Sequence, residues 1–403
     1  MLPEGWKMTN LGELATFKSG GTPSKQNASF WGGSNPWVSA KDLKIHYITS
    51  SLDTLTDVGF SAAHVAPIGS SLVLVRGMTL LKDFPVGFAT RDVAFNQDLK
   101  ALVPRAGVDP LFLSYALVAS KERIHELVSV AGHGTGKLET DRLKTFCVLL
   151  PSLSEQRAIA KVLTTWDETV AITQKLIANS IARKKALMQQ LLTGRRRLPG
   201  FTGKWRTQLL RTLCDVRRGA SPRPISDARW FAATGRGWVR ISDVTASEGE
   251  SLSRTKQYLS KEGEMASVAV DPGDLIMSIC ATIGVPKFLG IPACIHDGFV
   301  VFRNIHSDVS AKFLFHYLEF VSEELAASGQ PGTQKNLNTS IVGAIRIPTI
   351  TLPEQKRIAL VISTAHEETL NLAHQLLGLK RARSALLDQL LTGKRRVTLD
   401  SAV

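Results

Sequence analysis

The sequence predicts an α+β protein in which two tandem mixed α+β domains are each followed by one long helix. Three observations predict this class. Two helix patterns recur 199 residues apart, each comes after a segment long enough for one domain, and those two segments repeat the same framework residues in the same order. The predicted boundaries are a first domain at 1–150, a first helix at 151–197, a second domain at 198–349, a second helix at 350–396 and a tail at 397–403.

The two long helix patterns are close copies of each other. Shifting Glu155–Arg197 by 199 places it on Glu354–Arg396 without a gap, and 16 of the 43 residues are identical. At ~1.5 Å per residue, a helix of roughly 39 residues is about 58 Å long. An uninterrupted helix of that length is typical of a coiled coil or a spacer.

Both helices have matching start and stop signals. The first begins at Ser152-x-x-Glu155 and the second at Thr351-x-x-Glu354. This spacing predicts capping boxes, in which the hydroxyl and the carboxylate each accept a backbone N–H of the first turn. Gly194 and Gly393 follow the last apolar turns and predict the C-terminal stops.

An apolar seam with steps of four and three runs along each helix, which is coiled-coil spacing. We therefore predict that the two helices pair with each other rather than being unrelated amphipathic helices. A basic residue interrupts the seam at the same step in both copies, so Lys184 and Arg383 are expected to face each other, and leucine there is expected to stabilise the pair. The seam positions are Trp166, Val170, Thr173, Ile177, Ser180, Lys184, Leu187 and Leu191 in the first helix and Ala365, Thr369, Leu372, Leu376, Leu379, Arg383, Leu386 and Leu390 in the second.

The segments before the helices repeat at framework positions. Trp6 and Trp205, Gly20 and Gly219, and Pro23 and Pro222 all differ by 199. Short apolar runs predict buried strands at 71–76 and 274–279, and apolar helical stretches follow at 111–117 and 313–318. The triplet Asn96-Gln97-Asp98 is expected to correspond to Ile295-His296-Asp297. Strand-like runs are expected at 146–150 and 344–347.

The amino-acid composition limits the kinds of partner that the chain is expected to bind. The chain has 403 residues and a formal net charge of +14, with a pI near 9.7. This charge favours a polyanionic partner, nucleic acid before membrane, over a merely basic protein. No apolar run is long enough to cross a bilayer, and the first residues lack the pattern of a secretory signal. The four cysteines have no paired spacing and are expected to be reduced thiols, so we expect a cytoplasmic protein.

No enzyme motif is complete in the sequence. The Gly-rich stretch 132–137 lacks the first glycine and the final Ser/Thr of a phosphate loop, and no GxGxxG lies between a strand and a helix. The triplet at 96–98 is not an amino-methyltransferase motif. Glu354-x-Lys356 and its repeat mate lie in first helical turns, where Glu complements the helix dipole. The nine histidines form no HExxH cluster. We therefore expect no catalytic residue, no metal and no cofactor in this chain.

The loops between framework positions are rich in side chains that can contact DNA. Arg and Lys can take guanine, Asn and Gln can take adenine, and the backbone amides of Gly-rich loops suit phosphate oxygens. The candidates in the first domain are Lys18, Lys25, Lys41, Arg76, Lys82, Arg91, Gln97, Lys100, His133, Thr135 and Lys137. Those in the second are Arg217, Arg218, Arg223, Arg240, Arg254, Lys256, Thr333, Gln334, Lys335 and Asn336.

Basic runs follow both helices, Arg195-Arg196-Arg197 and Lys394-Arg395-Arg396. Two interpretations remain open for them. Cations near a helix C-terminus interact favourably with its dipole, and cations can also contact a DNA backbone.

Several of these motifs resemble those of the specificity (S) subunits of type I restriction–modification enzymes. They are Leu-Ser-Glu-Gln-Arg-Ala-Ile-Ala at 153–160, Leu-Pro-Glu-Gln-Lys-Arg-Ile-Ala at 352–359, both Leu-Leu-Thr-Gly ends, Gly-Thr-Pro-Ser at 21–24 and Gly-Thr-Gln-Lys-Asn-Leu at 332–337. The resemblance covers essentially the whole chain. The loop at 134–138 departs from it, because it lacks the Gln and Asn of its counterpart in the second domain.

The resemblance implies two target-recognition domains separated by two antiparallel helices that form a coiled-coil-like spacer with pseudo-two-fold symmetry. Each domain would read one half of a bipartite, asymmetric site in double-stranded DNA, and the helices would fix the gap. The helices would also dock two methyltransferase (M) subunits, which bind S-adenosylmethionine, and the complex would recruit restriction (R) subunits that use ATP and Mg. The rival hypotheses are a coiled-coil scaffold with two protein-binding domains, and an enzyme with an unrecognised site. A system that methylates without restricting is compatible with the same sequence.

Overall fold

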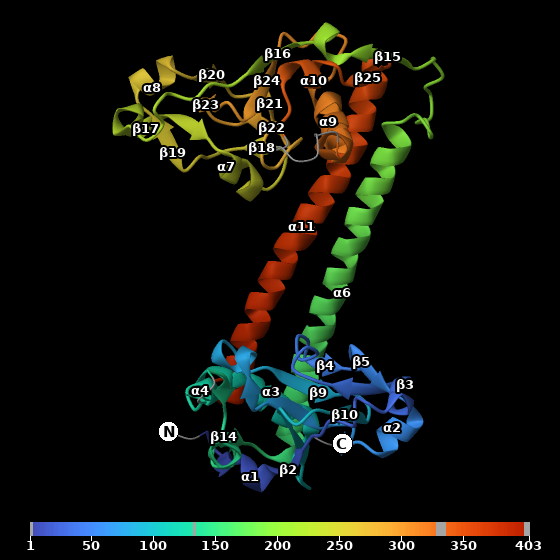
Figure 1. Cartoon of the computed structure of the whole chain (residues 1–403), viewed down its shortest axis with the longest axis vertical. Helices are drawn as coiled ribbons and strands as arrows, with labels where there is room; N and C mark the ends of the chain where they lie inside the picture. Colours follow the sequence, from blue (N-terminus) through green and yellow to red (C-terminus); the bar gives the residue numbers. More distant parts are fainter. Residues whose placement is uncertain (1–2, 132–133, 328–335, 399–403) are drawn as a thin grey trace. The chain divides into compact units, whose positions relative to one another are not determined.

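The computed structural model describes residues 3–131, 134–327 and 336–398, and it is drawn in Figure 1. By its internal contacts the chain divides into two compact units, Met1–Ala171 with Leu377–Val403, and Ile172–Leu376. Each unit contains one mixed α+β domain together with part of the two long helices, α6 (Leu153–Leu191) and α11 (Leu352–Leu391). The predicted α+β class and internal repeat are confirmed.

The domain of the first unit is built on two sheets. One sheet has the order β2-β11-β7-β9-β4 and the other has the order β5-β3-β10-β6. The five-stranded sheet consists of β2 (Ala15–Ser19), β11 (Leu99–Pro104), β7 (Ser71–Leu74), β9 (Val86–Ala89) and β4 (Tyr47–Ile48). The four-stranded sheet consists of β5 (Asp53–Leu55), β3 (Trp31–Val38), β10 (Val93–Phe95) and β6 (Val65–Ala66).

Short helices and small sheets complete this domain. Helix α3 (Pro110–Ala119) starts with proline at its first position and is capped by Asp109, whose carboxylate accepts from Phe112 N at 2.9 Å. The remaining strands are β1 (Lys7–Asn10), β14 (Cys147–Leu150), β8 (Arg76–Gly77), β12 (Ser129–Val130) and β13 (Gly136–Lys137). The remaining helices are α1 (Leu11–Leu14), α2 (Asp57–Ser61), α4 (Lys121–His125), α5 (Thr140–Lys144) and the 3-10 turns η1 (Ala28–Phe30) and η2 (Met78–Leu81).

The domain of the second unit repeats this topology. Its sheets have the orders β16-β24-β21-β22-β18 and β19-β17-β23-β20. Their strands are β16 (Asp215–Arg218), β24 (Phe299–Arg303), β21 (Leu275–Ser278), β22 (Pro286–Leu289), β18 (Ser251–Leu252), β19 (Gln257–Leu259), β17 (Phe231–Val239), β23 (Ala293–Ile295) and β20 (Val268–Val270). The other elements are β15 (Arg206–Leu209), β25 (Arg346–Thr349), α7 (Ile241–Ala246), α8 (Lys261–Met265), α9 (Ala311–Ala327), α10 (Thr339–Gly343), η3 (Leu210–Thr212) and η4 (Ala228–Trp230).

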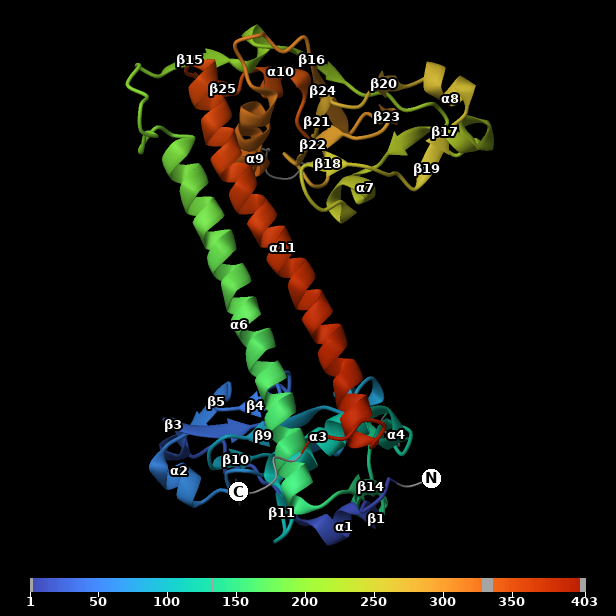
Figure 2. The same ribbon diagram turned by 180° about the vertical axis from the view of Figure 1, so that it is seen from behind.

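The strand pairings match in detail. In both domains the edge strand of the larger sheet is parallel to its neighbour, β4 to β9 and β18 to β22. In both, the central pair of the smaller sheet is also parallel, β3 with β10 and β17 with β23. Figures 1 and 2 show both domains from two sides. In the first domain the smaller sheet and α2 lie on the side away from α3 and α4. In the second domain the smaller sheet and α8 lie on the side away from α9. The predicted strands at 146–150 and 344–347 begin one and two residues later, as β14 and β25.

The long helices pack together in each unit through apolar side chains. In the first unit, Ile159 and Leu163 of α6 share one core with Leu387 and Leu390 of α11. In the second, Leu191 of α6 shares a core with Ile358 and other residues of α11. The start of one helix therefore meets the end of the other in both units, which is antiparallel packing.

The seam residues lie on the covered side of the helices. Ten apolar residues were predicted to pair, and each of them is buried or half-buried: Trp166, Val170, Ile177, Leu187, Leu191, Leu372, Leu376, Leu379, Leu386 and Leu390. Large apolar side chains that stay exposed on the same two helices are Ile172, Leu176, Ile181, Leu360 and Leu377.

Candidate nucleic-acid interface

In each domain two chain segments cross side by side from one sheet to the other. One segment follows β2 or β16, and the other is the turn from β10 to β11 or from β23 to β24. Their backbones are in direct contact, since Gly21 N donates to Phe95 O at 2.9 Å and Ala220 N donates to Ile295 O at 3.1 Å. A Cβ at Gly20 or at Gly219 would overlap the carbonyl oxygen of the other segment. We call these places the first and the second crossing.

The first crossing gathers several of the predicted residues. Thr22 Oγ1 donates to Gln97 Oε1 at 2.6 Å, and Lys100 Nζ donates to the hydroxyl of Ser19. Lys18 and Gln97 are exposed, and Lys100 is half-buried. An amide and two ammonium groups are therefore presented at one edge of the first domain.

The second crossing is built around Asp297. Ser221 Oγ donates to Asp297 Oδ1 at 2.6 Å, and Arg223 donates to Oδ2 at 3.1 Å. Arg218 Nε donates to the backbone carbonyl of the same residue at 2.7 Å. The hydrogen bond from Ser221, together with the nearby His296 and Arg223, lowers the pKa of the Asp297 carboxyl. The carboxylate is therefore ionised at neutral pH and is paired with a guanidinium.

The register of the turn differs from the sequence prediction by one residue. Phe95 pairs with Val38 and Ile295 pairs with Val239, so Phe95 corresponds to Ile295. Gln97 therefore corresponds to Asp297, whereas the sequence comparison had placed it against His296. The constant offset of 199 fails here, because the second domain has one extra residue in the preceding part.

A tryptophan lies under each crossing. Trp37 Nε1 donates to Gly21 O at 3.1 Å. Its counterpart Trp238 is 1% exposed, and its indole N–H has no partner among the residues that the structure describes. Trp238 also lines a cavity of about 180 Å³ together with His296, Arg223, Arg240 and Asp297. Burial lowers the pKa of His296, which favours its neutral form in this cavity.

Strands β3 and β17 are each followed by a segment whose backbone is held by an aspartate, and in the second domain this segment is the start of α7. Asp42 accepts from the backbone N–H groups of Ser39 and Leu52, at 2.8 Å each. Asp243 accepts from Arg240 N at 2.9 Å and from Lys256 N at 3.3 Å. The repeated Trp-Val-x-x-x-Asp motif thus serves the backbone, and it brings two of the predicted basic residues, Arg240 and Lys256, next to each other.

The remaining candidates make none of the hydrogen bonds that build the two crossings. Arg76 and Lys137 are strand partners in β8 and β13, and Lys137 forms an ion pair with Glu139. Thr135 and Lys137 are half-buried. Exposed candidates are Lys25, Lys41, Arg76, Lys82, Arg91, Arg217, Arg254 and Asn336. Four predicted residues, His133, Thr333, Gln334 and Lys335, lie outside the described residues.

The acidic residue of each predicted capping box has a different partner from the one expected. Ser152 Oγ accepts from Glu155 N at 3.3 Å, as a cap should. The Glu155 carboxylate, however, accepts from Trp6 Nε1 at 3.0 Å and from Arg396 at 2.9 Å. In the second unit the Glu354 carboxylate, 2% exposed, accepts from Arg197 at 2.6 and 2.8 Å. The reciprocal half of the box was therefore predicted wrongly.

These two contacts also involve the last residue of each basic run. The last arginine of each run, Arg197 or Arg396, forms a two-pronged ion pair with the first helical turn of the other long helix. This carboxylate partner was not among the two interpretations. A bidentate guanidinium–carboxylate pair has fixed geometry, so each end of the helix pair is locked to the adjacent start.

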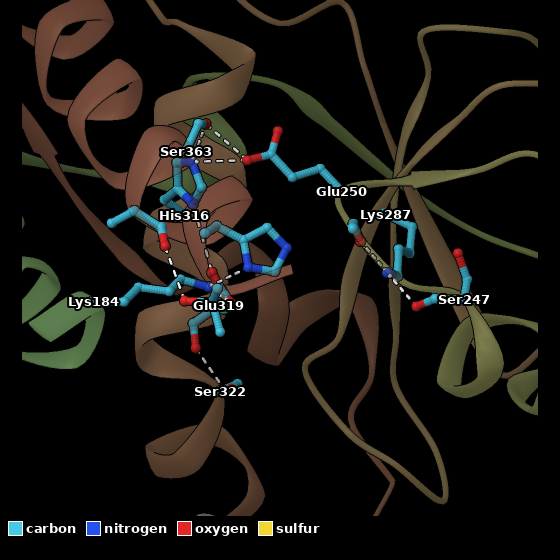
Figure 3. A network of polar contacts seen from close by, with 12 residues as sticks. Lys184, Ser247, Glu250, Lys287, His316, Glu319, Ser322 and Ser363 are labelled. Carbon is cyan, nitrogen blue, oxygen red and sulfur yellow. Dashed lines mark hydrogen bonds and ion pairs between the residues drawn. The ribbon is translucent and has the colours of Figure 1, made fainter. Parts of the chain in front are cut away.

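The prediction that Lys184 and Arg383 face each other is wrong. Lys184 Nζ forms an ion pair of 2.7 Å with Glu319 of α9 in the second unit (Figure 3). Arg383 Nε forms an ion pair of 2.8 Å with Asp167 of α6 in the first unit. In an antiparallel pair, the same step of the two seams lies at opposite ends, so equivalent residues do not meet.

Membrane spans and metal clusters are two other kinds of feature that bear on function. Over 3–131, 134–327 and 336–398, no helix is both long enough and apolar enough to cross a membrane. Within the same ranges there is no cluster of three or more His, Cys, Asp or Glu side chains suited to a metal ion.

Comparison with known proteins identifies the family. The family model described as type I restriction modification DNA specificity domain matches residues 3–181 and 204–378. The chain belongs to this family. The match occurs twice, once per α+β domain, so the predicted resemblance is confirmed. The family is one of DNA specificity domains, and it provides recognition rather than catalysis.

Relatives with curated names are similar over different lengths. The chain is 30% identical over 184 residues to the EcoR124I/EcoR124II specificity subunit of Escherichia coli, which is 45% of each protein. It is 28% identical over 195 residues to the MjaIX specificity subunit of Methanocaldococcus jannaschii, covering 46% of this chain and 43% of that one. These two matches therefore span less than half of each relative. The MjaVIII specificity subunit of the same archaeon is 22% identical over 426 residues, covering 98% and 94%.

Solved structures share the fold. The S subunit of the type I restriction–modification system from M. genitalium superposes with a TM-score of 0.62 at 15% identity, covering 97% of this chain and 98% of that one. The HsdS subunit from Thermoanaerobacter tengcongensis gives 0.51 at 21% identity, covering 98% of both. At these identities the likeness concerns the fold alone.

Proposed function

We propose that this chain is the specificity subunit of a type I restriction–modification complex and reads a bipartite, asymmetric site in double-stranded DNA. Each specificity domain contacts one half-site. The observation that carries the proposal is the pair of crossings, where one backbone arrangement presents an amide in one domain and arginines in the other. A repeated scaffold with two different sets of base-reading groups suits two different half-sites better than one shared reaction.

The chemistry of the candidates supports major-groove reading. Arginine and lysine pair with the acceptors of guanine, and glutamine and asparagine pair with adenine. The charge of +14 provides attraction to phosphates for both domains. Arg76, Lys137, Arg217, Arg254 and the other exposed basic candidates fit phosphate contacts better than base contacts, because they lie outside the crossings.

The proposal also assigns the partners. The family resemblance implies that two methyltransferase (M) subunits dock on α6 and α11, where Ile172, Leu176 and Leu360 are exposed apolar side chains available for contact. The M subunits would bring S-adenosylmethionine, and R subunits would bring ATP and Mg. This chain would supply recognition and spacing.

Sequencing of methylated bases in single DNA molecules tests the proposal. A host that expresses this chain with its cognate methyltransferase should methylate a two-part, asymmetric motif, and the motif should vanish when the gene for this chain is deleted. A methylome that deletion leaves unchanged would refute the proposal and favour the protein-scaffold hypothesis.

A domain exchange tests the assignment of one half-site to each domain. Replacing residues 18–150 with those of a relative of different specificity should replace one half of the methylated motif, and replacing 217–349 should replace the other. A hybrid that keeps its original motif would contradict the two-reader model.

A further inference from the structure

The two crossings share a hydroxyl that holds the side chain of the turn. In the first domain Thr22 donates to Gln97, and in the second Ser221 donates to Asp297, at 2.6 Å in both cases. The corrected register makes these four residues two equivalent pairs. We call this hydrogen bond the tether. It is the same in both domains, whereas the residue that it holds differs.

The tether leaves Gln97 free to present its amide. The hydrogen bond from Thr22 uses one lone pair of Gln97 Oε1, and an amide oxygen has two. The structure gives Nε2 no partner among the described residues. An exposed amide with one acceptor site and two donors matches adenine, which offers the N6 donor and the N7 acceptor in the major groove.

Asp297 has a different task, because each of its carboxylate oxygens already accepts a hydrogen bond from a protein side chain. Oδ1 accepts from Ser221, Oδ2 accepts from Arg223, and the backbone oxygen accepts from Arg218. Asp297 therefore holds Arg223 through its carboxylate and Arg218 through its backbone oxygen. Both arginines keep most of their donors, since a guanidinium has five N–H groups and each arginine uses one here.

The pairing with Asp297 favours a base over a phosphate as the partner of Arg223. The positive charge of Arg223, whose side chain is 71% exposed, is offset by the carboxylate, which weakens its attraction to a phosphate. The hydrogen bond to Asp297 limits the directions in which the free donors of Arg223 point. The side chain of Arg240 lines the adjoining cavity and adds further donors. Guanidinium donors complement the O6 and N7 acceptors of guanine.

We propose that the tethered turn residue determines the specificity of each domain. Gln97 reads adenine in the half-site of the first domain. Asp297 is a positioning residue that presents Arg218 and Arg223 to guanine in the half-site of the second domain. This inference rests on the proposed function, because it requires that the two domains read DNA.

Selection from randomised duplexes tests the inference. The full chain, assembled with its cognate methyltransferase, is incubated at one fixed salt concentration with DNA in which both half-sites are randomised, and the bound fraction is sequenced. Asp297→Asn keeps the size of the side chain and removes its charge. It should reduce the preference for guanine at one position of the second half-site by roughly 5- to 100-fold, with the first half-site unchanged.

Three more variants sharpen the test. Gln97→Glu replaces a donor by an acceptor and should abolish the preference for adenine in the first half-site alone. Arg223→Lys keeps the charge but loses the planar fork, so it should reduce the guanine preference as Asp297→Asn does. Asp271→Asn is the matched control, because Asp271 forms an ion pair of 2.8 Å with Arg236 in the same domain but away from the crossing. It should leave both half-sites unchanged.

The outcomes separate the inference from the proposed function. If the wild-type complex selects no two-part motif, the proposed function fails and the inference fails with it. If the wild type selects such a motif and both Asp297→Asn and Arg223→Lys weaken binding to all sequences equally, the inference alone is overturned. Should Asp297→Asn unfold in a thermal melt, Arg223→Lys and Gln97→Glu decide the matter, because both residues are exposed and their tethers are not needed for the core.

Discussion

The two places where a domain packs against the long helices bury different polar groups at equivalent positions. In the first unit Asp167 of α6 accepts from Tyr115 OH at 2.8 Å and from Tyr47 OH at 3.2 Å, and it forms the ion pair with Arg383. Tyr47 and Tyr115 are also 2.6 Å apart through their hydroxyls. We call this the first junction. It is a compact cluster of two phenols around one ion pair.

The second junction uses histidine and glutamate instead. His316 takes the place of Tyr115 on the equivalent helix, and its Nε2 lies 2.9 Å from Ser363 Oγ. Ser363 in turn donates to Glu250 at 2.7 Å, and Lys184 pairs with Glu319 (Figure 3). Burial alone would raise the pKa of the Glu319 carboxyl, but contacts with His316 and Lys184 outweigh it and lower the pKa to about 2.

The difference shows what the repeat holds constant and what it lets vary. Some polar positions are the same in both junctions, such as Tyr115 and His316, because the backbone repeat places them at the same contact between domain and helix. Glu319, in contrast, corresponds to Val118 in the first domain. The groups themselves have changed together, since a buried charge is tolerated only beside a partner. Each end of the helix pair therefore matches its own domain, and one partner cannot be exchanged without the other.

Removing the central carboxylate should have the largest effect. Asp167→Ala leaves Arg383 without its charge partner and both phenols without their acceptor, so we expect a loss of about 3–5 kcal/mol in the free energy of unfolding. Urea unfolding measures it. The control is Asp388→Ala, because Asp388 pairs with Lys394 on the surface, where both side chains are more than 60% exposed. Equal losses for the two variants would contradict a buried first junction.

Acid should weaken the first junction through His46. Burial lowers the pKa of His46 from 6.5 to about 4, an effect that the charge of Asp167 opposes and that of Arg383 supports. As the pH falls, His46 is therefore protonated in the unfolded chain before it is protonated in the folded chain. The contribution of neutral His46 to the free energy of unfolding is complete above pH 6.5 and is lost as the pH falls to about 4. The loss is on the order of 3 kcal/mol for a shift of this size. Unfolding measured from pH 7 to 4 should show a shallower slope for His46→Asn than for the wild type.

The second junction has its own pH window. Because the folded-state pKa of Glu319 is lowered from 4.5 to about 2, its contribution is complete above pH 4.5 and is lost as the pH falls through 2. Burial and then Lys184 also lower the pKa of His366, which acts in the same direction as His46. A slope unchanged by His46→Asn would assign the acid sensitivity above pH 4.5 to groups outside the first junction.

Lys184→Leu distinguishes the sequence-based prediction for this seam position from the ion pair found in the structure. The sequence pattern predicts that leucine stabilises the helix pair, whereas the structure predicts a loss of about 1–3 kcal/mol, because Glu319 would remain half-buried without its partner. The double variant Lys184→Leu/Glu319→Leu should recover much of that loss. A higher melting temperature for the single variant would restore the original expectation.

The smallest expected effect lies at a polar pair in the seam. Ser180 Oγ and Thr369 Oγ1 are 2.8 Å apart in the second unit, whereas the equivalent positions in the first unit carry Leu379 and Val170. Ser180→Ala should lower the free energy of unfolding by about 1 kcal/mol. Ser180→Leu with Thr369→Val introduces the apolar pair of the first unit, and unfolding should then be within about 1 kcal/mol of the wild type.

The candidate site was predicted from the sequence only in part. Residue types identified Gln97, Lys100, Arg218 and Arg223 as candidates among others of the same chemistry. Asp297 was not proposed as a site residue, since an acidic side chain does not suggest DNA contact on its own. The signal that could have found it was its alignment with Gln97, which the offset of one residue concealed.

The sequence by itself determined the repeat, the α+β class and the two long helices, because caps, stops and apolar periodicity act between residues that are near each other in the chain. Only the tertiary structure decided the partners of the charged residues. Glu155 binds Arg396, and Lys184 binds Glu319, across separations of 241 and 135 residues. The reason is that a local pattern fixes which face a side chain occupies, whereas the group that it meets there is set by how distant segments pack.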